Sequence, residues 1–133
     1  MMDEIKLKRI SKSGLAIALS ALGGFSKPEV RLEQYPTDSE VAANVLWNGY
    51  QLGDTKGKEI IDLGCGSGIL GIGALLLGAK KASFVDISNE ALDKARENVK
   101  KAKSEGSAIF YSCQVERFTE KGGIVFMNPP FGT

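Results

Sequence analysis

Apolar residues recur at two different spacings along this chain. From residue 58 onward, short apolar runs of strand length alternate with segments whose apolar residues return every three or four positions, as on one side of a helix. We predict strands over 59–63, 82–86, 108–111 and 123–127. We predict the connecting helices over 69–77, closed by Gly78, and over 88–103, capped by Ser88 and ended by Gly106. Strand–helix alternation with continuous apolar strands predicts an α/β fold, a parallel sheet with helices on both faces.

Before residue 58 only the helical spacing is present. We predict an amphipathic helix over 3–22 and a second helix that starts at Thr37, an N-cap residue that forms a capping box with Glu40. The predicted buried residues of the first helix are Ile10, Ile17 and Ala21. Those of the second are Val41, Val45, Gly49 and Leu52. We expect one domain, with an N-terminal helix and linker over 1–36 and a ligand-binding core over 37–133.

Composition excludes several kinds of chemistry. The chain has 17 Lys plus Arg, 16 Asp plus Glu and no His, so histidine acid–base catalysis and histidine metal sites are ruled out. The two cysteines, Cys65 and Cys113, lack the spacing of metal ligands, and we expect no metal site. No apolar run approaches the ~18 residues of a membrane span. We therefore expect a cytoplasmic protein that does not enter a membrane.

A glycine-rich segment, Asp62-Leu63-Gly64-Cys65-Gly66-Ser67-Gly68, lies between the first predicted strand and its helix. Glycines let the backbone turn sharply and let a ligand approach the main chain, and the helix that follows offers amide donors. The acid at the strand's end either contacts the methionine end of a cofactor or orients the loop. Gly66, Gly68 and Gly71 also match the G-x-G-x-x-G pattern of dinucleotide-binding proteins. Of the two glycine patterns, we favour D-x-G-x-G-x-G over G-x-G-x-x-G, because the strand already ends at Asp62-Leu63-Gly64.

Asp86 stands at the end of the second predicted strand. A carboxylate there can accept hydrogen bonds from both ribose hydroxyls of an adenosine. It serves S-adenosylmethionine and a nicotinamide cofactor equally well. Asp86 therefore predicts an adenosine-containing cofactor without deciding which.

A third motif, Asn128-Pro129-Pro130-Phe131, follows the last predicted strand. The prolines stiffen the turn, so that the Asn128 side-chain carbonyl and the Pro129 backbone carbonyl can accept both hydrogens of an adenine amino group. The nitrogen lone pair then becomes nucleophilic without a strong base. Phe131 can stack on the base, an interaction worth ~1–3 kcal/mol. These four residues are the predicted catalytic group.

Together these motifs resemble the small ribosomal-RNA adenine-N6 methyltransferases of archaea and eukaryotes. The discriminating string is Leu32-Glu33-Gln34-Tyr35-Pro36-Thr37, ahead of the glycine loop. The resemblance implies a class I, Rossmann-like methyltransferase fold with strand order 3-2-1-4, and S-adenosyl-L-methionine as cofactor. The cofactor contacts that it implies are Gln34, Thr37, Gly64, Ser67, Ile69 and Asp86, with Gln114 and Val115 beside the adenine. Gln114 stands where the family usually has Asp, so we expect a changed contact there.

The resemblance also implies partners and a missing part. The substrate would be RNA, most specifically small-subunit ribosomal RNA, and a small zinc-binding activator protein would dock along the edge strand. Family members continue past Asn128-Pro129-Pro130-Phe131-Gly132-Thr133 with three more strands, so we expect the chain alone to have little methylation activity and an unprotected fourth strand. The alternatives are a methyltransferase for DNA adenine, guanine N2 or protein glutamine, a nicotinamide-dependent oxidoreductase, and a non-catalytic binding module.

Overall fold

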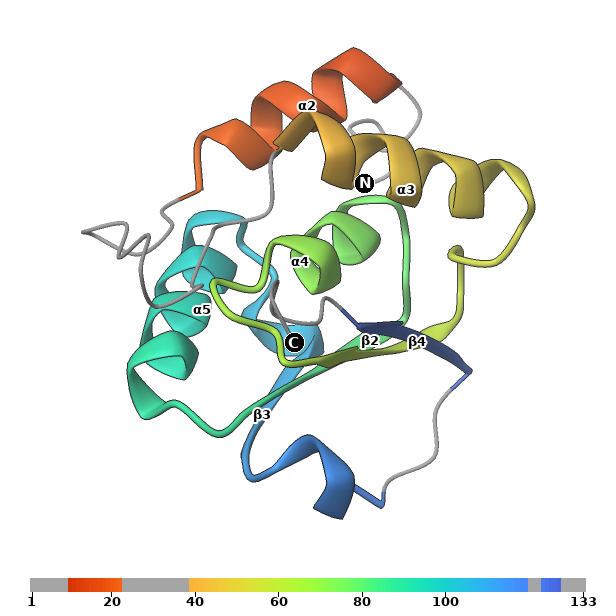
Figure 1. The fold of residues 1–133 in the computed structure, drawn as a ribbon. Helices are drawn as coiled ribbons and strands as arrows, with labels where there is room; N and C mark the ends of the chain where they lie inside the picture. Colours follow the sequence, from red (N-terminus) through yellow and green to blue (C-terminus); the bar gives the residue numbers. More distant parts are fainter. Residues whose placement is uncertain (1–9, 23–38, 120–122, 128–133) are drawn as a thin grey trace.

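Four parallel strands form one sheet in the order β3-β2-β1-β4 (Figure 1). The computed structural model of the chain describes residues 10–22, 39–119 and 123–127. The strands are β1 (Glu59–Leu63), β2 (Lys81–Asp86), β3 (Ala108–Ser112) and β4 (Ile124–Met127). Asp62 pairs with Phe84 on one side and Phe126 on the other, and Asp86 pairs with Ser112. The predicted parallel α/β sheet and its strand order are confirmed, with strand ends displaced by at most one residue, while the described α-helices cover one face rather than both.

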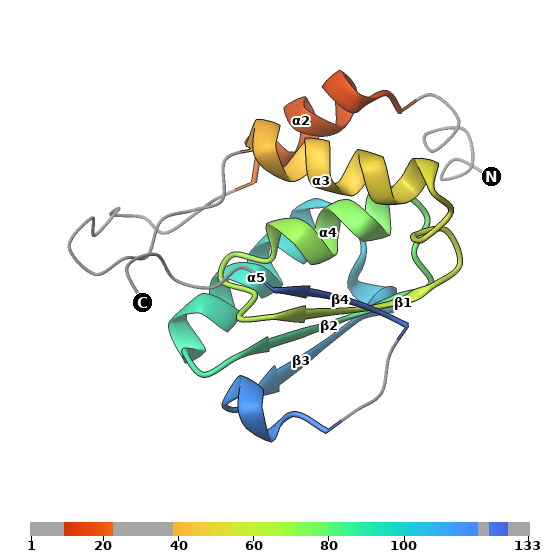
Figure 2. The ribbon, with the colours of Figure 1, turned by 45° about the vertical axis from the view of Figure 1, so that its right-hand side comes forward.

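The α-helices form layers over one face of the sheet (Figure 2). The connecting helices, α4 (Ile69–Leu76) and α5 (Asn89–Lys101), pack directly on the strands. Outside them lie α2 (Lys12–Ser20) and α3 (Ser39–Gln51), which pack on each other and on α4. None of these described helices is long and apolar enough to cross a membrane.

No described α-helix packs on the opposite face of the sheet. Two short 3-10 segments, η2 (Glu105–Ser107) and η3 (Val115–Arg117), flank β3. Beyond η3, the ring of Phe118 meets that of Tyr111 edge-on, with 5.0 Å between centroids. Side chains alternate between the two faces of a strand, so this contact lies opposite Phe110 and the helices.

The core lies between the sheet and α4 and α5. Phe84 of β2 is fully buried there and stacks on Phe110 of β3, with 5.2 Å between ring centroids. Alternate residues of β1 and β2 face the same way, so Ile60 and Ala82 join them. Leu92, Ala95 and Val99 of α5 complete the packing, as their i, i+3, i+7 spacing predicts. Each large apolar side chain buried in this way contributes ~1.5–3 kcal/mol.

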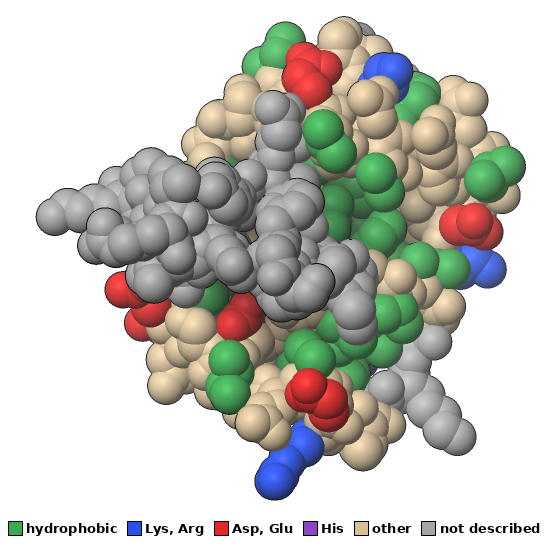
Figure 3. All heavy atoms as spheres, in the orientation of Figure 1, with side chains coloured by type: hydrophobic (Ala, Val, Ile, Leu, Met, Phe, Trp, Pro, Cys, Tyr) green, Lys and Arg blue, Asp and Glu red, His purple; other side chains and the backbone are tan. Residues whose placement is uncertain are grey.

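The predicted buried stripes of the two N-terminal helices are mostly wrong, although Ile10 is partly buried against the core as predicted. In α3, Val41, Val45 and Leu52 are 55%, 48% and 77% exposed, and Gly49 is only partly buried. The buried residues are Ala42, Ala43 and Leu46. The helix is turned by one residue, about 100°, from the prediction. Figure 3 shows hydrophobic side chains on the surface where Figure 1 has α3.

The turn of α3 follows from close packing against α4. A Cβ at Gly73 of α4 would overlap the side chain of Leu46, so Leu46 of α3 packs into the space left by the glycine. In α2, too, the predicted stripe is mostly exposed: Ile17 is 70% exposed and Ala21 is exposed, while Leu15, Ala16 and Leu19 are buried. Among the described residues, α2 begins at Lys12, after Ser11, whose hydroxyl accepts a hydrogen bond from the Gly14 amide at 3.0 Å. The predicted N-cap Thr37 lies outside the described residues.

The helix after β2 ends earlier than predicted. α5 stops at Lys101, and Lys103 adopts a left-handed conformation with φ of 56°. The Ser104 amide donates to Val99 O at 3.0 Å across this turn. This is the arrangement that usually employs glycine. Here Lys103 makes the turn, and Gly106 lies in η2 instead.

Candidate functional site

The glycine loop connects β1 to α4 at the carboxyl edge of the sheet. Three of its residues have positive φ, namely Gly64 at 66°, Gly66 at 56° and Gly68 at 86°. A Cβ built on Gly64 or Gly66 would meet no atom within 4 Å, so open space adjoins the backbone at both positions. The loop therefore has the conformation that the glycine pattern predicts, and a ligand can contact its main chain directly.

Asp62 supports the loop from beneath. Its side chain is 1% exposed, and its Oδ2 accepts a hydrogen bond from the Gly71 amide in α4 at 2.9 Å. Burial raises the pKa of this carboxyl from 3.8 to about 7; the charge of Asp86 adds to the rise, while the Gly71 bond opposes it. Of the two roles predicted for this acid, the geometry favours orienting the loop, because its carboxylate is turned toward the helix.

Asp86 joins the end of β2 to the same loop. Its Oδ2 accepts from the Gly66 amide at 3.0 Å, and its Oδ1 accepts from the Ser88 amide at 2.9 Å. Each carboxylate oxygen has two lone pairs, so the side chain, which is partly exposed, keeps capacity for ligand hydroxyls. Ile87, which follows it, is 64% exposed. Sequence reasoning missed Ile87, although an apolar residue directly after a strand-end acid was the available signal.

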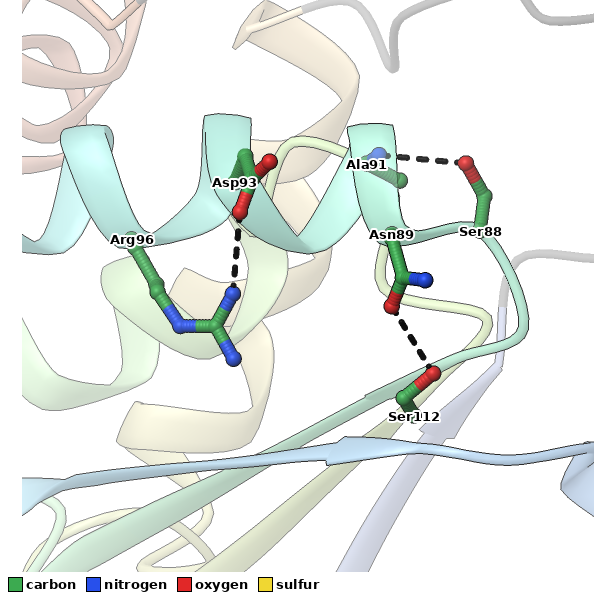
Figure 4. Close-up of polar contacts among 6 residues, drawn as sticks. All are labelled: Ser88, Asn89, Ala91, Asp93, Arg96 and Ser112. Carbon is green, nitrogen blue, oxygen red and sulfur yellow. Dashed lines mark hydrogen bonds and ion pairs between the residues drawn. The ribbon is translucent and has the colours of Figure 1, made fainter.

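The end of β3 reaches the same edge and is fastened to α5. Ser112 Oγ donates to Asn89 Oδ1 at 3.0 Å (Figure 4). The Cys113 amide donates to Asp86 O at 3.1 Å. The Ser88 hydroxyl caps α5 by accepting from the Ala91 amide at 3.1 Å. Hydrogen bonds therefore link the ends of β2 and β3 to each other and to the start of α5.

The two predicted adenine neighbours follow the end of β3. Gln114 is exposed, and Val115 begins η3 half-buried. Further along α5, the Arg96 guanidinium lies 4.9 Å from the centroid of the Phe110 ring and 3.1 Å from Asp93 Oδ1. Because the Cys113 amide bonds to Asp86 O, Gln114 and Val115 follow β3 close to the end of β2.

Cys65 has a structural place in the loop. It is 7% exposed, and its amide donates to Val85 O at 2.9 Å. Burial, followed by the charges of Asp62 and Asp86, raises the pKa of the thiol well above its ordinary range. A protonated, buried thiol is a poor nucleophile. Cys65 therefore supplies backbone geometry to the loop.

Two parts of the predicted site lie outside the described residues. They are the cofactor contacts Gln34 and Thr37 and the catalytic group Asn128, Pro129, Pro130 and Phe131. β4 ends at Met127, which pairs with Leu63, so the chain leaves β4 at the edge where β1 enters the glycine loop. The described part of the site brings together Asp62, Gly64, Cys65, Gly66, Ser67, Gly68, Ile69 and Asp86, with Gln114 and Val115 at its margin.

The strand order, the left-handed glycine loop and the strand-end acid define the class I methyltransferase fold. Residues 44–128 match the family model described as ribosomal protein L11 methyltransferase (PrmA), and the chain belongs to this family. The family assignment confirms the predicted cofactor, S-adenosylmethionine.

Named relatives match nearly the whole chain. It is 36% identical to the rRNA N(6)-adenosine-methyltransferase METTL5 of Danio rerio over 97% of this chain and 62% of that protein. It is 34% identical to the uncharacterized protein MJ0284 of Methanocaldococcus jannaschii, over 92% and 60%. The crystal structure of PH1948 from Pyrococcus horikoshii has a TM-score of 0.84 and 48% identity, over 92% and 60%. The predicted resemblance is confirmed, and the chain spans about three fifths of the length of these relatives.

Proposed function

We propose that this chain is the cofactor-binding part of a methyltransferase that transfers the methyl group of S-adenosylmethionine to the N6 amino group of adenine in ribosomal RNA, with the small-subunit RNA as the specific substrate. The observation that carries the proposal is the extent of the likeness to METTL5 of Danio rerio, 97% of this chain, which includes the residues ahead of the cofactor loop. Ribosomal protein L11 methyltransferases, by contrast, match 36% to 45% of it.

The described residues fit the cofactor. Open space beside Gly64 and Gly66 leaves room for the cofactor's amino-acid part against the main chain. Asp86 would offer carboxylate oxygens to the ribose, and the exposed side chains of Ile87 and Gln114 would lie beside the adenine. When bound, the cofactor supplies an electrophilic methyl group on a positively charged sulfur.

The acceptor group would be prepared by the Asn128 motif. The side-chain oxygen of Asn128 and the backbone oxygen of Pro129 would accept hydrogen bonds from the two N–H groups of the adenine amino group, which leaves its lone pair free to attack. The N–CH3 bond would form as the bond from sulfur to methyl breaks, S-adenosylhomocysteine would leave, and the methylated nitrogen would lose one proton to water. Phe131 would stack on the base. No residue of this group needs to titrate near neutral pH, which agrees with a chain that has no histidine.

A second candidate is methylation of a protein amino group, favoured by the PrmA family match. That match covers residues 44–128, mainly the cofactor-binding core, and a likeness in this core does not identify the methyl acceptor.

A small zinc-binding activator also belongs to the proposal. β3 pairs only with β2 among the described strands, and Ile109 on it is 38% exposed, which supports a free docking edge.

The test has two parts. Calorimetric titration of the chain with S-adenosylmethionine, S-adenosylhomocysteine and NAD should show saturable binding of the first two alone; binding of NAD alone would favour the oxidoreductase. Radiolabelled S-adenosylmethionine is then offered with ribosomal RNA and ribosomal proteins to the protein isolated from its own source, so that any further residues are included. N6-methyladenosine in the digested RNA, lost in Asn128→Ala, is the expected product. Label in protein alone would support the second candidate.

A further inference from the structure

Asn98 is a fully buried polar residue on the apolar face of α5. Ala91, Leu92, Ala95 and Val99 share that face and are buried, and Asn98 is 0% exposed. A buried amide is costly unless its hydrogen bonds are made. Asn98 directs its Nδ2 away from the helix and donates to Ser67 O at 2.9 Å, 31 positions earlier in the chain.

The acceptor lies in the centre of the glycine loop. Ser67 is 8% exposed and stands between Gly66 and Gly68, both with positive φ. The carbonyl of Ser67 and the amide of Gly68 belong to one planar peptide unit. The Gly68 amide donates to Cys65 O at 2.8 Å, so hydrogen bonds hold both ends of that unit. Since glycine dihedrals rotate at little steric cost, this pair of bonds fixes a peptide that would otherwise turn easily.

We propose that Asn98 is a positioning residue for cofactor binding, which it serves by holding the Ser67–Gly68 peptide plane. The inference rests on the proposed function, since it takes the glycine loop as the S-adenosylmethionine site. α5 starts just after Asp86, the predicted ribose acceptor, with Ser88 as its N-cap. The same helix carries Asn98, which holds the glycine loop. Asn98 is too deeply buried to touch the cofactor and acts through Ser67.

The test compares Asn98→Asp with Val99→Ala. The first change keeps the shape of the side chain but replaces its donor with an acceptor that repels Ser67 O. The second truncates the neighbouring core residue, 1% exposed, and leaves the loop contact intact. Titration with S-adenosylhomocysteine at about pH 9, where the buried carboxyl is ionised despite a raised pKa, should show ~10-fold weaker binding for Asn98→Asp, the size of one good hydrogen bond. Val99→Ala should lower Tm and leave that dissociation constant near the wild-type value.

A pH series adds a signature that packing defects lack. At acidic pH the carboxyl introduced by Asn98→Asp takes up a proton and can donate to Ser67 O again. Its binding deficit relative to wild type should therefore shrink as pH falls. Wild-type affinity in Asn98→Asp, or an equal loss in Val99→Ala, would overturn the proposal.

Amide hydrogen exchange keeps the inference testable if Asn98→Asp does not fold. In Asn98→Ser, the amides of Gly66 and Gly68 should exchange ~10-fold faster than in wild type, while those of β2 stay unchanged, as expected for local opening. Uniform acceleration along the chain would refute the positioning role. Should the wild-type chain bind no S-adenosylhomocysteine, the proposed function fails instead, and this exchange comparison still decides whether Asn98 holds the loop.

Discussion

Asp86 Oδ2 lies 3.0 Å from the Gly66 amide nitrogen, so a side chain at the end of β2 fixes the backbone of a loop 20 positions earlier. The same carboxylate is the ribose acceptor that the sequence predicts. Asp86→Asn should therefore harm binding twice, through the weaker acceptor and through the released loop. A hydrogen bond to a charged group is worth about 1.5–3 kcal/mol, so calorimetry should show S-adenosylhomocysteine binding weakened at least ~10-fold.

The matched control for this change is Asp93→Asn. Asp93 is also an acid and lies on α5, but its side chain is 73% exposed and pairs with Arg96 on the surface. Surface ion pairs contribute little, so both affinity and Tm should stay close to wild type. If Asp93→Asn and Asp86→Asn weakened binding equally, a general charge effect would replace the proposed contact.

The sequence predicts the glycine loop and the strand ends better than the facing of the N-terminal helices, and the reason is physical. A glycine loop and a strand-end acid act through local backbone geometry, which short motifs determine. Asn98 could be suspected from a polar residue on an apolar stripe, but its partner Ser67 is distant in sequence and only the fold brings them together. Gly71 was read only as part of a dinucleotide pattern, whereas in the structure it lets α4 approach Phe84.

The facing of α3 could not be predicted from hydrophobicity alone. Val41 and Val45 form the more apolar stripe, and they are the exposed one. The buried stripe is instead that of Ala42, Ala43 and Leu46, and the Leu46 side chain occupies the space that Gly73 of α4 leaves open. Such a preference depends on the partner helix, which periodicity within one helix does not reveal.

Asp62 gives the protein a specific dependence of stability on pH. Its pKa is about 7 in the folded chain and 3.8 as the ordinary value, so between these values the folded state holds a proton that the unfolded state has released. The contribution of the Asp62 carboxyl to the free energy of unfolding is therefore fully present below pH 3.8 and is lost as the pH rises through 7. Asp62→Asn keeps an acceptor for the Gly71 amide and removes the titration.

The measurement is Tm for both proteins from pH 5 to pH 8. The Tm of wild type should fall relative to that of Asp62→Asn from pH 5 to about pH 7, at up to ~1.4 kcal/mol per pH unit in free energy, and the difference should level off above pH 7. Taking the difference between the two proteins cancels the other titrating groups. Parallel curves would show that Asp62 is ionised in the folded chain throughout, contrary to the effect of its burial.

Gly71 is required by close packing between α4 and β2. A Cβ at this position would overlap the Phe84 ring and come within 3.2 Å of Asp62 Oδ2. We expect Gly71→Ala to destabilise the chain by ~1–3 kcal/mol through overpacking, even though alanine favours helices. Gly106→Ala is the control, because a Cβ there meets nothing within 4 Å and φ is not left-handed. Urea unfolding should place that control within ~0.5 kcal/mol of wild type; equal effects would argue against the packing explanation.

β4 is an outer strand with an apolar surface. In the described sheet it pairs with β1 alone, and Val125 is 53% exposed on the face that bears no described α-helix. Open, apolar strand edges promote association between chains, and a lysine on such an edge opposes it. We therefore expect the wild-type chain to self-associate as its concentration rises and Val125→Lys to weaken this association by ~10-fold or more. Sedimentation velocity over a concentration series measures the effect.

The control is Val45→Lys, which replaces a valine of α3 that is 48% exposed and lies away from any strand edge. This variant should sediment as wild type does. Monomeric wild-type protein at every concentration, or equal relief by Val45→Lys, would show that the edge of β4 does not drive association.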